Sequence, residues 1–140
     1  MTTPPELIAF VAGYPLLLAH LGIAFLAFFL WSAIYTLTSR GREISQIRDG
    51  NQASSIIYGV TLLALALTLG QAVSTSSGLI DIAIWVAAAG LVQLTLFGAV
   101  DLVLAGLTGR IRDDADTSAA ILLGCARLAV AWLFASALKV

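Results

Sequence analysis

The side chains in this sequence that could do chemistry lie inside or beside long apolar segments. Arg127 and Asp101 occur within such segments, as do His20 and Gln93. An arginine at the centre of a membrane-spanning helix costs on the order of 2.5–3.5 kcal/mol unless it is paired or reaches water. A short connection joins the apolar segment that contains Asp101 to the one that contains Arg127. We therefore expect the two helices to be antiparallel neighbours and the two side chains to form an ion pair.

Each of these residues has more than one reading. The favoured role of Arg127 is a clamp between helices, and the alternatives are a place in a water-lined polar path or a side chain that snorkels to the surface. His20 is predicted to be a hydrogen-bonding packing residue, with a proton-linked function as the alternative. Gln93 lies deep in its segment and needs a partner on another helix, because an amide in lipid requires hydrogen bonds.

Polar residues also stand where apolar segments begin. Asp81 follows Gly78 by three residues, and a carboxylate in the first turn of a helix is favoured by the helix dipole. Asn51 follows Gly50 just before another apolar segment, and Asp116 occupies the comparable place later in the chain. Asn and Asp are preferred N-cap residues, so helix capping is the favoured reading of both.

No set of residues predicts catalysis, a cofactor or a metal. One cysteine and one histidine exclude a disulfide framework and a zinc cluster of these residues. The acidic run 113–116 lacks the spacing, glycine and closing glutamate of a calcium loop. A net charge of −1 gives no electrostatic basis for binding nucleic acid. We therefore expect a protein that is not an enzyme.

The composition identifies the elements that must position these side chains. Of 140 residues, 60% are hydrophobic and 11% are charged, whereas an average soluble domain has about 25% charged residues. The apolar runs reach the roughly 20 residues that cross a bilayer and do not alternate as strands would. The sequence predicts one all-α integral membrane domain, residues 1–140, with four transmembrane helices at about 14–36, 53–73, 79–105 and 118–138.

Basic residues predict the orientation of these helices. Five arginines lie in the two connections after the first and third spans, against one lysine on the other side: Arg40, Arg42, Arg48, Arg110 and Arg112, against Lys139. This bias places both connections in the cytoplasm and both termini outside. The N-terminus shows no pattern of a removable signal peptide.

Local signals refine the first two spans. Gly13 and Pro15 predict a break between a short interfacial segment and the first span. Trp31, Tyr35 and Tyr58 are predicted to be aromatic anchors towards the membrane interface.

The chain also repeats itself. Parts of the connection at 37–49 parallel 107–113, and residues 54–59 align with 119–124 at an offset of 65. Each unit consists of a span, an arginine-bearing connection and a second span, so the two copies have parallel topology. The sequence predicts tandem two-helix repeats at about 7–73 and 79–140.

Residues 47–53, I-R-D-G-N-Q-A, precede a helix start rich in small residues. This segment resembles the G-N-x-A signature of the YjfL-type bacterial inner-membrane protein family (domain of unknown function 350). Asp81 with Trp85, and Gln93, resemble that family's third helix. The resemblance covers nearly the whole chain, although residues 115–118 depart from the signature in the second copy. It implies a multi-pass protein of the bacterial inner membrane, associated with envelope stress.

Two classes of function remain open. The first is a non-enzymatic scaffold or envelope-stress component whose arginine connections contact anionic lipid or a cytoplasmic partner. The second is a small homo-oligomeric channel or transporter whose polar path includes Arg127 and Asp101. A scaffold predicts that the polar side chains pair within one subunit, whereas a channel predicts that they converge on a hydrated oligomer axis. The scaffold is the preferred interpretation, and small residues on the helices favour a compact bundle that self-associates.

Overall fold

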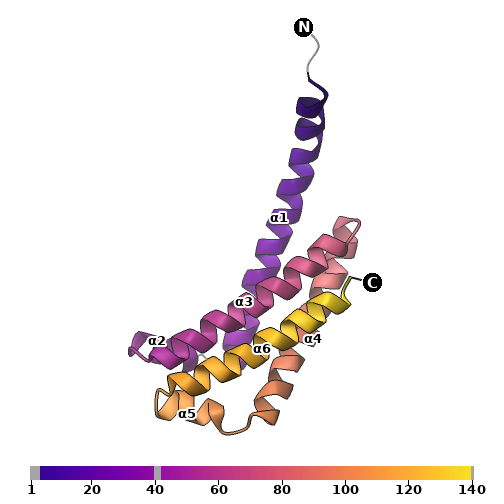
Figure 1. Cartoon of the computed structure of the whole chain (residues 1–140). Helices are drawn as coiled ribbons and strands as arrows, with labels where there is room; N and C mark the ends of the chain where they lie inside the picture. Colours follow the sequence, from indigo (N-terminus) through magenta and orange to yellow (C-terminus); the bar gives the residue numbers. More distant parts are fainter. Residues whose placement is uncertain (1–3, 40–41, 140) are drawn as a thin grey trace.

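The structure is a computed structural model that describes residues 4–39 and 42–139, so Arg40 of the first arginine connection lies outside the described residues. Six helices and no strands occur in these two ranges (Figure 1). The helices are α1 (Pro5–Thr38), α2 (Arg42–Arg48), α3 (Gln52–Thr75), α4 (Leu79–Val103), α5 (Leu107–Asp113) and α6 (Thr117–Ala137).

Four of these helices, α1, α3, α4 and α6, are long and apolar enough to cross a membrane, with mean hydropathies between 1.9 and 2.1. The predicted all-α integral membrane fold is confirmed, and the bounds of α3, α4 and α6 lie within two residues of those expected. The two arginine connections are not plain loops, because each contains a short helix, α2 or α5.

The predicted break in the first span is wrong, because α1 continues through Pro15 as one helix of 34 residues. Proline removes only one backbone donor, and a continuous helix keeps the other backbone groups paired where no water can replace them. At 1.5 Å per residue α1 is about 51 Å long. Its N-terminal half projects away from the other helices (Figure 1), with exposed apolar side chains such as Phe10 and Leu17.

The core forms where α3 and α6 lie side by side (Figure 1). Each helix presents a stripe of mostly small buried residues to the other. Small residues allow two membrane helices to approach closely, and Gly124 shows this, since an added Cβ would lie 3.3 Å from Val60. The buried residues of the α6 stripe are Ala119, Ala120, Leu123, Gly124, Arg127, Ala131 and Ala135.

Helix α1 meets α4 where the Trp31 indole lies on Gly90. A Cβ added at Gly90 would lie 2.0 Å from the Trp31 ring, so only glycine fits beneath it. Trp31 is partly buried against the core formed by α1, α3 and α4. It therefore packs between helices, which corrects its predicted role as an interfacial anchor.

The junctions that lead into α3 and α6 have the same backbone geometry. Asn51 (φ −72°, ψ 105°) and Asp116 (φ −71°, ψ 103°) both cap their helices, each accepting from the N–H three residues later. The residue before each cap has a positive φ, 87° at Gly50 and 51° at Ala115. Both predicted caps are confirmed, while duplication of the whole two-helix unit stays a prediction.

Candidate functional site

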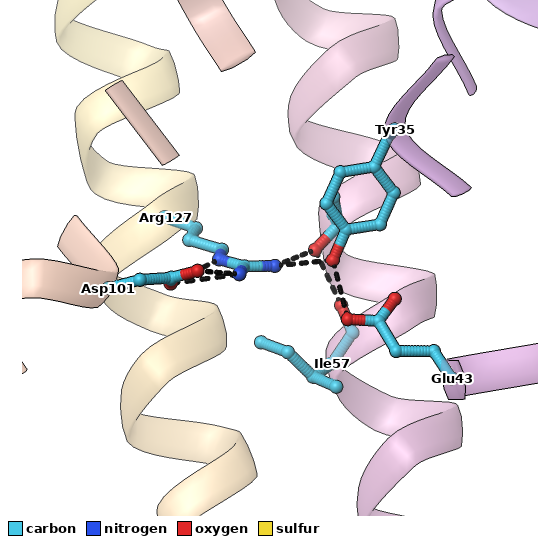
Figure 2. Close-up of polar contacts among 6 residues, drawn as sticks. Tyr35, Glu43, Ile57, Asp101 and Arg127 are labelled. Carbon is cyan, nitrogen blue, oxygen red and sulfur yellow. Dashed lines mark hydrogen bonds and ion pairs between the residues drawn. The ribbon is translucent and has the colours of Figure 1, made fainter. Parts of the chain in front are cut away.

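Arg127 is the centre of a polar cluster that joins all four spanning helices (Figure 2). From α6, its Nη2 donates to the Asp101 carboxylate of α4 at 2.6 Å and 2.8 Å, and Nε donates to the same group at 3.1 Å. Its Nη1 donates to the hydroxyls of Tyr35 on α1 and Thr61 on α3, each at 2.8 Å. The predicted pairing of Arg127 with Asp101 is therefore present, within one chain.

Both hydroxyls that accept from Arg127 donate onward (Figure 2). The Thr61 hydroxyl donates to the Ile57 carbonyl at 2.8 Å. The Tyr35 hydroxyl donates to Oε1 of Glu43, on α2, at 2.8 Å. A continuous chain of hydrogen bonds thus runs from Asp101 through Arg127 and Tyr35 to Glu43, and it links α4 with α2.

Burial makes these contacts necessary. The Arg127 side chain is only 4% exposed and that of Asp101 is 33% exposed. The rings of Tyr35 and Phe97 flank the guanidinium, with centroids 5.7 Å and 5.4 Å from its Cζ, and aromatic faces attract cations. Ion pairing, hydrogen bonding and these rings together offset the cost of removing the charge from water.

The direction of the Arg127 side chain explains how it reaches Asp101. Arg127 lies ten residues into α6, about 15 Å along the helix axis, whereas Asp101 lies near the end of α4. Helical side chains tilt towards the N-terminus of their helix. Arg127 therefore points from mid-span towards the end of the bundle that carries α2 and α5.

Glu43 connects the buried cluster to that end of the bundle. Burial raises the pKa of the Glu43 carboxyl, an effect that outweighs the hydrogen bond from Tyr35 and the charge of Arg127. Its Oε2 atom is buried and has no hydrogen-bond partner among the described residues. Two cavities border Glu43, one of about 220 Å³ and one of about 20 Å³. The smaller has room for about one water molecule.

Asn51 has a second role besides capping. Its Oδ1 accepts from the Ser54 N–H at 3.0 Å, while its Nδ2 donates to the Ile111 carbonyl of α5 at 3.1 Å. Gln46 makes a similar link, since it accepts from the Ser54 hydroxyl and donates to the Arg112 carbonyl. These bonds tie α2 and the start of α3 to α5. Gly50 provides the positive φ that this turn requires.

Gln93 has the interhelical partner that the sequence predicted. Its Oε1 accepts from the Thr68 hydroxyl at 2.8 Å, and both residues are fully buried. Its Nε2 has no partner among the described residues. This pair lies apart from the Arg127 cluster, in the direction of the turn between α3 and α4.

Asp81 and His20 also lie outside the cluster. Asp81 is in the first turn of α4 and accepts from the Ser77 N–H at 2.9 Å, so it stabilises the helix start as expected. His20 Nδ1 lies 2.7 Å from the Leu16 carbonyl on its own helix. Because a carbonyl only accepts, this nitrogen carries the proton.

Three members of the cluster were missed by reasoning from sequence alone. Tyr35 was predicted to be an interfacial anchor, but it is 6% exposed and contacts Arg127, so that prediction is wrong. Thr61 and Glu43 were not singled out from the sequence as members of any site. The requirement that a membrane-buried guanidinium use its N–H groups was the only available signal, and it does not say which helix supplies the acceptors.

The described residues contain no group of three or more His, Cys, Asp or Glu side chains placed to hold a metal ion. What the cluster can do is hold four helices together through a charge, or hold and pass a proton between its titratable groups.

Comparison with known proteins gives one family. The model for Domain of Unknown Function (DUF350) matches residues 9–138. The chain is 29% identical over 124 residues to the UPF0719 inner membrane protein YjfL of Escherichia coli (strain K12), an alignment that covers 89% of this chain and 88% of the relative. The protein of the same name from Escherichia coli O157:H7 matches to the same extent. No solved structure gives a significant match.

Proposed function

The chain belongs to the DUF350 family, and on that premise we propose that it is a non-enzymatic scaffold of a bacterial inner membrane. Its Escherichia coli relative is named an inner membrane protein, which supports the location. The scaffold would take part in the response to envelope stress, as the family resemblance implied. The arginine-bearing end, with α2 and α5, would face the cytoplasm and meet a partner there.

The observation that carries this proposal is the set of contacts made by Arg127. Its partners Asp101, Tyr35 and Thr61 come from three other helices of the same chain. In a scaffold the buried polar groups hold the protein's own helices together. All three nitrogens of the Arg127 guanidinium donate hydrogen bonds to other helices of the same chain. A channel would need the same group to face a hydrated path shared between subunits.

The interior beyond the cluster supports the same conclusion. Between the Thr68–Gln93 pair and the turn that joins α3 to α4, the described core is apolar and includes Leu69, Ile82 and Val86. Leu69 is 2% exposed and Ile82 is fully buried. An apolar, buried layer of this kind opposes the passage of ions through a single subunit.

Ion flux in reconstituted vesicles tests the scaffold proposal. We expect liposomes that contain the purified protein to leak protons and potassium no faster than empty liposomes. An Asp101→Asn variant serves as a control, because it removes the charge of the carboxylate that holds Arg127. A wild-type conductance that this substitution changes would contradict the scaffold.

The alternative is a small homo-oligomeric channel or transporter. The cavity of about 220 Å³ beside Asp101 and Arg127 favours it, because a transport pathway needs a vestibule. The conductance just described, together with an oligomer whose axis is lined by these residues, would establish this second function.

The proposed orientation follows from the arginine bias and has its own test. In a variant without Cys125, single cysteines at Asp49 and Ser77, both exposed, report opposite sides of the membrane. We expect a membrane-impermeant thiol reagent to label Ser77→Cys in intact spheroplasts and Asp49→Cys only after lysis. Labelling of Asp49→Cys in intact spheroplasts would reverse the orientation.

A further inference from the structure

The larger cavity beside the Arg127 cluster lies at the end of the bundle where α2 and α5 sit. It encloses about 220 Å³, less than the roughly 300–1,000 Å³ of sites that surround drug-sized ligands. Its walls combine apolar side chains, hydroxyls and charges. Leu94 and Phe97 supply apolar surface, and Thr38 and Thr108 supply hydroxyls.

Two guanidinium groups in this cavity are available to a ligand. The charge of Arg127 is neutralised by Asp101, so it contributes little net attraction. Arg42 of α2 and Arg112 of α5 also line the cavity, and both are exposed. Neither forms an ion pair with any residue that the structure describes.

Glu43, in the same wall, adds a requirement for a hydrogen-bond donor. Its Oε1 is occupied by the Tyr35 hydroxyl, whereas its Oε2 is buried and unpartnered within the described part of the chain. A buried oxygen without a donor costs free energy comparable to a lost hydrogen bond. A ligand that bonds to Arg42 and Arg112 and also carries a donor would satisfy all three groups.

We propose that this cavity binds the headgroup of a phospholipid, with the phosphodiester held by Arg42 and Arg112 and a headgroup hydroxyl or ammonium donating to Oε2 of Glu43. Guanidinium groups match phosphate oxygens in geometry and charge. Basic pockets at the ends of membrane helices are suited to lipid headgroups. The ligand class is therefore a glycerol- or ethanolamine-type phospholipid.

The surroundings of the cavity suit a lipid. The cavity lies where spanning helices α1 and α4 meet the short arginine-bearing helices, which is the level of headgroups in a bilayer. Its volume accommodates a headgroup but not acyl chains. The chains would lie on α4 one turn nearer the bilayer centre, where Leu91, next to the cavity-lining Leu94, is 63% exposed. The biological meaning of this site rests on the proposed scaffold function, but its binding chemistry does not.

Lipid titration of the purified full-length protein in detergent tests the proposal. Dioleoylphosphatidylglycerol is added at increasing mole fraction, and the thermal unfolding midpoint is followed by tryptophan fluorescence. We expect a saturable rise in the midpoint, and at least a tenfold weaker apparent affinity in Arg42→Gln/Arg112→Gln, since a charged hydrogen bond contributes about 1.5–3 kcal/mol. Arg48→Gln, an exposed arginine of α2 that does not line the cavity, should bind as the wild type does.

Further ligands identify the chemistry. Phosphatidylethanolamine should also bind, whereas phosphatidylcholine, whose headgroup has no hydrogen-bond donor, should bind more weakly. Glu43→Gln should lose this discrimination while it still binds phosphatidylglycerol. If soluble glycerol 3-phosphate alone gives the full effect, the phosphate site stands but its source is not a lipid. Equal responses of the wild type and the Arg42/Arg112 double variant would overturn the proposal. None of these results depends on ion flux. The scaffold function and the phospholipid site can therefore be contradicted independently of each other.

Discussion

The pairing of Arg127 with Asp101 makes a quantitative prediction about single and double substitutions. Asp101→Leu leaves a guanidinium that is 4% exposed with only two neutral hydroxyl partners. Breaking a buried pair in this way costs about 3–5 kcal/mol. Arg127→Leu leaves Asp101, whose side chain is 33% exposed and borders the larger cavity. Because that carboxylate can reach water, we expect a smaller loss of about 1–3 kcal/mol.

The double variant removes both charges and leaves neither stranded. It should cost no more than Arg127→Leu alone, so the coupling energy should be at least the cost of Asp101→Leu, about 3 kcal/mol or more. The free energy of unfolding is measured in mixed micelles by titration with a denaturing detergent and tryptophan fluorescence. Additive losses, or a larger cost for Arg127→Leu than for Asp101→Leu, would refute the reasoning.

A second ion pair provides the control. Arg110 and Asp116 are also paired, but their side chains are 59% and 19% exposed. Exposed pairs contribute about 0.2–1 kcal/mol. With Arg110→Gln and Asp116→Asn, the latter chosen because it preserves the helix cap, we expect a coupling energy below about 1 kcal/mol.

Three further predictions concern single positions. Asn51→Asp should lower the thermal unfolding midpoint, though less than Asn51→Ala does, because a carboxylate keeps the cap but cannot donate to the Ile111 carbonyl of α5. An unchanged midpoint in Asn51→Asp would show that Asn51 acts only as a helix cap. Gly90→Ala should lower the thermal unfolding midpoint, because the new Cβ would clash with the Trp31 ring. Gly98→Ala is the control, because nothing lies within 4 Å of a Cβ at that position. Equal midpoints for the two variants would show that the Trp31 indole can move aside. Burial raises the pKa of Glu43 above its ordinary value of 4.5, so its contribution favours folding in acid and is lost as pH rises through the raised value. The thermal unfolding midpoint of Glu43→Gln should therefore rise relative to that of the wild type as pH increases. A difference between the two midpoints that does not change with pH would contradict this.

The sequence was sufficient for the elements whose physics is local. Apolar runs of sufficient length predicted the four spans, and residue type and position predicted the caps at Asn51 and Asp116. The ion pair followed from the cost of a lone Arg127 and from the short connection between its helix and that of Asp101.

What the sequence did not predict depends on tertiary packing. Tyr35 has the type and position of an interfacial anchor, and only the packing of α1 against α3 and α4 turns its hydroxyl towards Arg127. Glu43 enters the cluster because its connection folds into helix α2 beneath the bundle. Pro15 signals a break in water-soluble chains, and in α1 the need to pair backbone groups outweighs that signal.

An experimental structure of the protein in lipid nanodiscs tests the central claim most directly, because it shows the oligomer and the surroundings of Arg127 together. The account predicts that every Arg127 is bonded to Asp101, Tyr35 and Thr61 of its own subunit, with no continuous water column between subunits. An Arg127 that faces a water-filled axis, or that pairs with a carboxylate of a neighbouring subunit, would contradict it.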